Sequence, residues 1–347
     1  MKTKFIFTAT LLCITLFAMA VILLVSCATK AAYNKDGFEM DGTTLVKYYG
    51  FEENVNIPAS VTAIAGVTAV GEGAFYDNTD ITSVTIPASV TSIGDGTFAF
   101  CDNLINITVD SKNNVYSSIN GVLYNKDILI AYPAGKKERD YIIPTGVTSI
   151  GDFAFAGCSG LVSVTIPAGV TSIGNNAFRG CVSFTSVSIP SSVETIGNGA
   201  FFGCESLASI IIPSSVTSIG FQAFWACTSL TSITIPASVN SIGNNAFEWC
   251  SNLASVTITQ GVVSIGHGAF ADCTSLTSIT IPPSVTSIGD YAFSNTGLTS
   301  ITIPSSVITV GDIAFLGCDN LKTVTASRKT TLGERAFPPT AQITYSD

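Results

Sequence analysis

Cysteine is the residue type in this chain with the widest capacity for redox, metal or nucleophilic chemistry, and there are ten. No two are spaced as Cys-x-x-Cys, which argues against a zinc site. Eight of them lie three residues after a phenylalanine of a repeated motif. They would then stack at the spacing of neighbouring strands, about 4.8 Å, whereas a disulfide needs Cβ atoms about 3.5–4.5 Å apart. We expect small buried thiols rather than a disulfide framework, at Cys101, Cys158, Cys181, Cys204, Cys227, Cys250, Cys273 and Cys318.

The single histidine, His267, is the other candidate for chemistry. It follows an Ile-Gly pair, at a position that other repeats fill with acids, amides and a phenylalanine, so we interpret it as an exposed surface residue. The chain also has no nucleophile elbow, no phosphate-binding glycine loop and no paired carboxylates with a supporting base. The sequence therefore predicts no catalytic residue, no metal site and no cofactor, and we expect no enzyme activity.

Composition narrows the class of protein further. Charged residues make up 11% of the 347 residues, against about 25% in an average soluble protein. With 47% hydrophobic residues, the chain is not of the disordered class. A net charge of −9 gives little drive for binding a polyanion, which argues against a nucleic-acid partner.

The N-terminus has the features of an export signal. Lys2 and Lys4 precede an uncharged run from Phe5 to Val25, and Leu-Val-Ser-Cys ends at Cys27. A small residue before a cysteine that closes an apolar run resembles the lipobox of bacterial lipoproteins. The resemblance implies a signal peptide over residues 1–26, lipidation of Cys27, and export to the outer membrane or cell surface. An uncleaved membrane helix is the alternative, since 21 apolar residues can just span a bilayer.

The rest of the chain is periodic, and the period decides the fold. Phenylalanines recur every 22 or 23 residues, except for one gap of 57. Glycines and prolines repeat with them. The eleven phenylalanines are Phe75, Phe98, Phe155, Phe178, Phe201, Phe224, Phe247, Phe270, Phe293, Phe315 and Phe337.

One repeat, residues 207–227, predicts one turn of a coil. Its β-branched residues favour a short strand, which Pro213 ends. Gly220 permits a tight corner, and the Ala-Phe…Cys spacing after it suits a short helical turn. A repeat cannot cover its own apolar side, so each must stack on its neighbours. The sequence predicts a repeat solenoid of about 11 rungs.

The motif L-x-x-I-x-I-P-x-x-V-x-x-I-G-x-x-A-F-x-x-C closely resembles the BspA-like leucine-rich repeat. The resemblance covers roughly residues 38–345. It implies a curved solenoid with short parallel strands on one face and loops and short helical turns on the other. It also implies a surface or secreted location and, for some members, adhesion to extracellular matrix proteins or other cells.

Departures from the period mark the expected boundaries. Residues 27–37 read as a flexible tether, and residues 38–50 as a hairpin that caps the first rung. The gap of 57 holds 11 residues more than two rungs, and we place an inserted hairpin at about 110–143, with its turn at Asn125-Lys126-Asp127.

Four aromatic residues break the small or polar habit of their repeat positions: Phe202, Phe221, Trp225 and Trp249. By register, we expect the first, third and fourth of these in consecutive rungs at nearly the same angular position. Large aromatics on a Ser/Thr surface can anchor an interface. The alternative is that they lie over the turns as extra packing.

Two classes of function remain open. One is a lipid-anchored surface binding protein whose partner is a protein or glycoprotein, in host matrix or on other cells. The other is a structural, envelope-associated repeat protein that binds a partner of the same organism. We expect a monomeric solenoid in either case.

Overall fold

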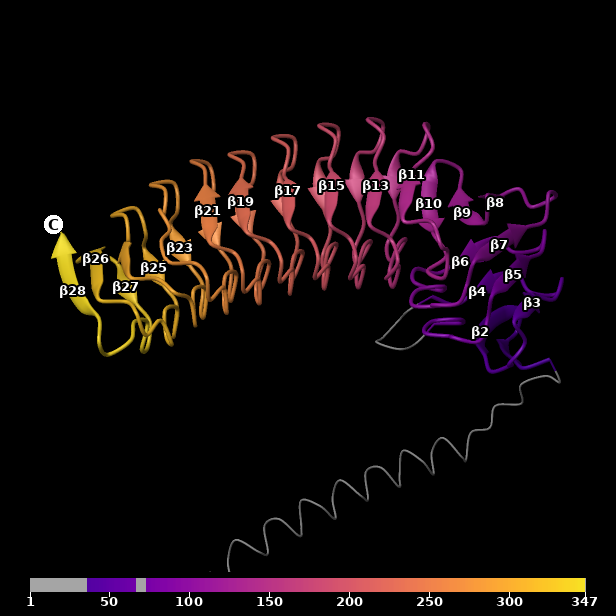
Figure 1. Ribbon diagram of the computed structural model, residues 1–347, viewed down its shortest axis with the longest axis horizontal. Helices are drawn as coiled ribbons and strands as arrows, with labels where there is room; N and C mark the ends of the chain where they lie inside the picture. The colour runs from indigo at the N-terminus through magenta and orange to yellow at the C-terminus, as the bar shows by residue number, and fades with distance from the viewer. Residues whose placement is uncertain (1–35, 67–72, 347) are drawn as a thin grey trace, which may run out of the picture.

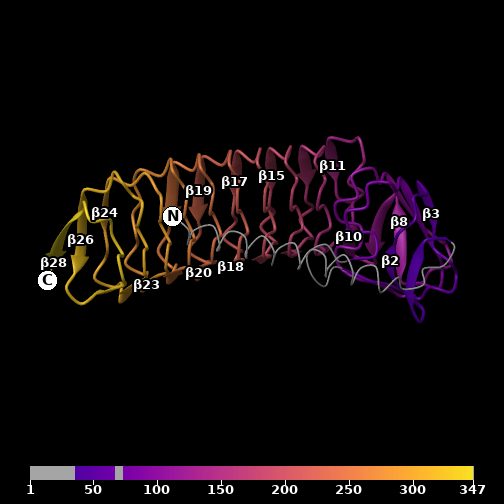
Figure 2. The ribbon, with the colours of Figure 1, turned by 90° about the horizontal axis from the view of Figure 1, so that it is seen from below.

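The computed structural model describes residues 36–66 and 73–346. Its strands follow one another along a curved solenoid (Figures 1 and 2). The rungs from β10 to β28 form a shallow arc, and the N-terminal rungs turn away from that arc near β8–β10. None of the described residues forms a helix long and apolar enough to cross a membrane.

Each repeat contributes two short strands. In the repeat described above, β17 (Ser209–Ile211) precedes the proline and β18 (Ser218–Ile219) precedes the glycine. Side chains alternate across a strand, so Ile210 is buried while both of its neighbours are exposed. We call strands of the first kind proline-side strands and those of the second kind glycine-side strands, after the residue that follows in most repeats.

The glycine-side strands form one long parallel sheet. Each is offset from the next by one repeat, so that Ile150 pairs with Ile173 and Ile173 with Ile196. These strands are β12 (Ser149–Ile150), β14 (Ser172–Ile173), β16 (Thr195–Ile196), β18, β20 (Ser241–Ile242), β22 (Ser264–Ile265), β23 (Ser287–Ile288), β25 (Thr309–Val310) and β27 (Thr331–Leu332).

The proline-side strands of the same arc form two further parallel sheets. Thr257 and Thr280 make an isolated bridge at the end of the first. Its strands are β11 (Asp140–Ile142), β13 (Ser163–Thr165), β15 (Ser186–Ser188), β17, β19 (Ser232–Ile235) and β21 (Ser255–Ile258). The second has β24 (Ser300–Thr302), β26 (Thr323–Ser327) and β28 (Gln342–Ser346).

The N-terminal rungs repeat this plan with two smaller sheets. On the proline side lie β3 (Asn54–Asn56), β5 (Ser83–Ile86) and β7 (Asn106–Val109). On the glycine side lie β4 (Ala63–Ile64) and β6 (Ser92–Ile93), preceded by the antiparallel hairpin of β1 (Phe38–Asp41) and β2 (Thr44–Tyr48). The hairpin thus covers the first glycine-side strand.

The insertion joins the two parts. It contains β8 (Tyr116–Ile119), β9 (Val122–Asn125) and β10 (Ile128–Ala131), and β10 pairs in parallel with β12. Alternate residues of β9 enter different cores: Val122 and Tyr124 pack with the C-terminal rungs, and Leu123 packs with the N-terminal rungs. A strand buried on both faces therefore forms the joint of the solenoid.

The number of rungs exceeds the number of sequence repeats. Leu45 of β2 pairs with Ile64, and Leu129 of β10 pairs with Ile150, so each occupies the place of a ladder isoleucine. Tyr48 and Tyr132 likewise extend the phenylalanine stack, on Phe75 and Phe155. The hairpin and the insertion each supply a level, giving about 13 turns in place of the expected 11.

The turns opposite the strands are not helical, contrary to expectation. Backbone N–H groups there alternate between two acceptors: Trp225 donates to Gln222 O within its own rung, and Phe224 donates to Ala246 O in the next rung. Gln222 and Ala226 have φ of 53°, a left-handed conformation that ends a right-handed helix. The described part of the chain contains no helix.

Stacked like residues hold the rungs together. From Phe155 to Phe337 the ring centroids are 4.9 to 5.4 Å apart, with interplanar angles of 2° to 19°. The corner glycines of neighbouring rungs are also in close contact: a Cβ on Gly220 would lie 2.6 Å from the carbonyl carbon of Gly197. Only glycine allows the corners this approach.

Candidate binding surface

The rung cysteines are packing residues. All eight are buried and free. Each thiol donates a hydrogen bond to the carbonyl of the phenylalanine or tyrosine in the preceding rung; the distance from Cys227 Sγ to Phe201 O is 3.2 Å, and from Cys250 Sγ to Phe224 O it is 3.1 Å. The sequence expectation of unpaired, buried thiols is met.

The same burial makes these thiols unreactive. Burial raises the pKa of the Cys101 and Cys250 thiols to about 12, well above that of a free thiol. Burial also raises the pKa of Cys204 and Cys227. Because the thiolate is the nucleophile and the metal ligand, the ladder offers neither function. Within the described residues no group of three His, Cys, Asp or Glu side chains could hold a metal ion.

His267 belongs to a hydrogen-bonded ladder on the surface. In this ladder an Asx side chain after Ile-Gly accepts the backbone N–H of the same position one rung on: Asp152 Oδ1 from Asn175 (2.7 Å) and Asn175 Oδ1 from Asn198 (2.9 Å). His267 donates its N–H to Asn244 Oδ1 at 2.9 Å, and its ring lies 3.3 Å from Asp290. Its side chain is 60% exposed, in agreement with the sequence interpretation.

Phe221 interrupts this Asx ladder. Its own N–H donates to Asn198 Oδ1 at 2.8 Å, but its ring has no oxygen to offer the next rung. In the described structure the N–H of Asn244 accordingly has no side-chain acceptor. The ring of Phe221 is 46% exposed. This phenylalanine therefore stands where an asparagine would stabilise the stack.

Phe202 and Trp225 form part of a column across four consecutive rungs. Their rings stack with centroids 4.4 Å apart and an interplanar angle of 14°. The Arg179 guanidinium lies 4.1 Å from the Phe202 centroid, and Trp225 Nε1 donates to Glu248 Oε2 at 3.2 Å. We call these four residues the aromatic column. Its rings are half-buried, with partners along the solenoid axis.

Trp249 lies outside this column, contrary to the register argument. Phe202 and Trp225 directly follow the ladder phenylalanine of their rungs, whereas Trp249 is the second residue after it, so Glu248 takes the place of the third member. The sequence analysis missed Arg179 and Glu248. The exact repeat spacing of Arg179, Phe202, Trp225 and Glu248 was the signal that could have found them.

Trp249 is instead an exposed ring on a strained backbone. Its side chain is 49% exposed, and its φ is +64°. The same position is a left-handed glycine in four other repeats, at Gly157, Gly180, Gly203 and Gly317. A bulky residue in this conformation carries strain. Trp249 and Phe221 are thus exposed aromatics at positions where the repeat favours smaller residues, as is Tyr291, which is 50% exposed with a φ of +57°.

Cys27, the predicted lipidation site, lies outside the described residues. The predicted signal peptide (1–26) and nearly all of the predicted tether (27–37) do so as well. Lipid anchoring therefore stays a prediction from the sequence.

Comparison with known proteins identifies the repeat. The profile of the BspA type leucine rich repeat region (6 copies) matches residues 39–129, 134–254 and 240–346. No curated protein matches the chain.

Solved bacterial repeat proteins have the same fold. A leucine-rich repeat protein from Eubacterium ventriosum ATCC 27560 is similar at 30% identity and a TM-score of 0.64, over 71% of this chain and 65% of that chain, so the match spans less than two thirds of its length. The pneumococcal vaccine antigen PcpA is similar at 20% identity and a TM-score of 0.52, over 85% of this chain and 68% of that chain.

A leucine rich cell surface protein from Faecalibacterium prausnitzii A2-165 shares 28% identity over 85% of this chain and 94% of that chain, with a TM-score of 0.49. The family profile covers most of the residues that form the stacked rungs described above. The chain belongs to the BspA-type leucine-rich repeat family.

Proposed function

We propose that the protein is a lipid-anchored cell-surface binding protein. It adheres to a protein or glycoprotein partner through the surface formed by the turns opposite the strands. The observation that carries the proposal is the pair of exposed aromatics. Phe221 and Trp249 stand where the repeat favours asparagine and glycine, and each is about half exposed. Side chains that weaken the stack and remain exposed are of the kind that anchor interfaces.

The aromatic column has a supporting role in this proposal. Its rings already contact one another, and its two charged ends are satisfied by Phe202 and Trp225. We assign Phe202 and Trp225 to packing of the surface, and Phe221 and Trp249 to contact with the partner. The sequence left two interpretations of the four aromatics open, interface contact and extra packing, and this proposal assigns two residues to each.

Anchoring through Cys27 completes the proposal. Two or more acyl chains would hold the protein stably at a membrane, where a single chain would not. Replacing Cys27 with alanine should abolish lipid addition and leave an uncut precursor or a released form, seen by mass spectrometry of the membrane and soluble fractions. A variant that stays in the membrane fraction at the parent mass would point to the membrane helix instead.

The binding experiment compares two variants of the full-length chain on a panel of immobilised extracellular matrix proteins. The Phe221→Asn/Trp249→Gly double variant should lose at least about 2 kcal/mol of binding free energy, a loss typical of interface hot spots. Trp225→Ala should instead lower the stability of the fold, because it removes a ring stack and a hydrogen bond.

Two outcomes count against the proposal. Binding that is saturable but unchanged in the double variant would exclude the two exposed aromatics as contacts. A parent protein that binds none of the matrix proteins but co-purifies with an envelope component would favour the structural role instead.

A further inference from the structure

The two sheets end unevenly at the N-terminal end of the solenoid. On the glycine side the sheet continues past β4 through β2 and then β1, whereas on the proline side it ends at β3. Among residues 36–66 and 73–346, no strand lies beside β3 at the level of β2. One strand place is therefore open, next to the first proline-side strand.

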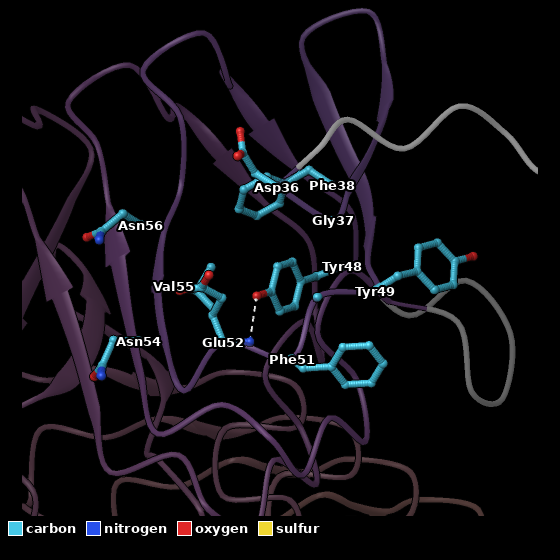
Figure 3. Close-up of a pocket in the computed structure, with 11 residues that line it drawn as sticks. Asp36, Gly37, Phe38, Tyr48, Tyr49, Phe51, Glu52, Asn54, Val55 and Asn56 are labelled. Atoms are coloured by element: carbon cyan, nitrogen blue, oxygen red, sulfur yellow. Dashed lines mark hydrogen bonds between the residues drawn. The ribbon is translucent and has the colours of Figure 1, made fainter.

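A hollow occupies this place. It has a volume of about 650 Å³ and is lined by β3, by the start of β1 and by the segment that links β2 to β3. Figure 3 shows Asn54, Val55 and Asn56 along one side, with Phe38 and Tyr48 across from them. At the rim, the ring of Phe51 is 86% exposed and that of Tyr49 is 53% exposed. Both could cover the side chains of an added segment.

The backbone of β3 is ready to pair on this side. Glu53 O accepts the N–H of Ser83 at 2.9 Å, and Ile57 N–H donates to Thr85 O at 3.1 Å. Since backbone groups alternate in direction along a parallel strand, those of Asn54 and Asn56 point away from β5. In the described structure these N–H and C=O groups have no protein partner.

The surroundings of the hollow are acidic. Asp36 and Glu52 line it, and Glu53 precedes β3. Glu39 and Asp41 lie in the neighbouring hairpin strand. Over residues 36–56 the one basic side chain is Lys47, and its Nζ donates to Gly73 O at 3.1 Å. A segment that carries lysine or arginine is the complementary occupant.

We propose that β3 is a strand-addition site that takes an extended, basic segment of a partner protein. The segment pairs with the backbone of Asn54 and Asn56, its side chains lie against Phe51 and Tyr49, and its cations face the acidic groups. Edge-strand pairing of this kind supplies affinity through main-chain hydrogen bonds and specificity through side chains. The site is separate from Phe221 and Trp249, and it goes beyond the binding function proposed above.

Two capped hexapeptides, KTVTVK and ETVTVE, test the proposal with the full-length chain. The basic peptide should slow hydrogen exchange at the amides of Asn54 and Asn56, measured by NMR. It should also bind at least about tenfold more tightly than the acidic one, a preference that weakens with added salt. Equal affinities, or no protection by either peptide, would overturn the proposal, since the acidic residues would then only blunt an exposed edge.

Asn56→Pro and Asn56→Ala form a matched pair of variants. Proline removes the outward N–H and is tolerated at a sheet edge, whereas alanine keeps the N–H. The proline variant should lose peptide binding and the alanine variant should keep it, with equal melting temperatures. Binding that is equal in the two variants contradicts the proposal.

If Asn56→Pro does not fold, a charge variant tests the proposal instead. Glu52→Lys with Glu53→Lys should abolish the preference for KTVTVK, because it leaves three acids and three lysines in residues 36–56 in place of five acids and one lysine. An unchanged preference contradicts the proposal. So does self-association of the parent chain that blocks peptide binding and disappears in Asn56→Pro, because the occupant of the edge would then be a second copy.

Discussion

At the scale of the residue, the thiols are explained by where their hydrogen bonds go. Each cysteine follows a ladder phenylalanine and directs its S–H to the carbonyl one rung earlier, as Cys181 does to Phe155 O at 3.1 Å. Serine would fit the same geometry, but its more polar hydroxyl is costlier to bury in an apolar column. Cysteine supplies a weak donor on a small apolar side chain.

Alkylation tests this role directly. The native full-length protein should protect the eight rung thiols from iodoacetamide, because each is buried. The unfolded protein should expose all eight without any reductant, as counted by mass spectrometry of its peptides. Fewer than eight reactive rung thiols in denaturant would mean that some are joined as disulfides.

The raised thiol pKa values predict that stability falls in alkali. Unfolded cysteines lose their protons from about pH 8.5, while burial keeps the folded thiols protonated, with a pKa of about 12 for Cys101 and Cys250. The folded state then binds more protons than the unfolded state. The free energy of unfolding should therefore fall as pH rises above about 8.5, by about 1.4 kcal/mol per pH unit for each such thiol.

Urea unfolding under reducing conditions, between about pH 8 and pH 10, measures this slope. The Cys250→Ala variant is the control: it should be less stable than the parent at pH 8, and this difference should narrow as pH rises, because its slope is shallower by one thiol's share. A free energy of unfolding that stays constant over this range would contradict the account.

At the scale of the element, the period predicted the strands and the stacking correctly. Alternating β-branched residues, a following proline and a glycine corner are local signals, and they reappear as β17 and β18. The Ala-Phe…Cys spacing was misleading because it fits both a helical turn and a ladder of turns. The left-handed conformation of Gln222 and Ala226 distinguishes the ladder of turns from a helical turn, but neither residue type indicates that conformation from the sequence.

The stacked glycine corners give a prediction for this scale. Gly220→Ala should destabilise the protein by about 1–3 kcal/mol, since the added Cβ meets the backbone of Gly197 and Asn198 at 2.6 Å. Gly160→Ala is the matched control, because its Cβ would have no neighbour nearer than 4.0 Å. Equal melting temperatures for the two variants would mean that the corners are not in close contact.

At the scale of the whole molecule, stability and binding depend on different residues. Stability comes from identical groups stacked on one another, a sum of contacts between neighbouring rungs. Contact with a partner depends on departures from the repeat. The sequence was sufficient to identify Phe221 and Trp249 as such departures, because the repeat itself states what each position favours.

The sequence was insufficient for the rest of the surface and for the N-terminal end. Trp225 and Trp249 differ by one residue in register, and this difference decides whether a ring stacks in the aromatic column or faces solvent. The open strand place beside β3 depends on how the first hairpin continues one sheet and not the other. The period of the repeat carries no information about how the solenoid ends.

Thermal unfolding of the Phe221→Asn/Trp249→Gly double variant tests the central claim most directly, because it requires no knowledge of the partner. The asparagine introduced at position 221 can accept the N–H of Asn244 and restore the Asx ladder, a gain of about 0.5–1.5 kcal/mol. The glycine introduced at position 249 suits the left-handed backbone. The account predicts a melting temperature equal to or above that of the parent, with Trp225→Ala well below both. A double variant that melts as low as Trp225→Ala would contradict it, because the two exposed aromatics would then be packing residues.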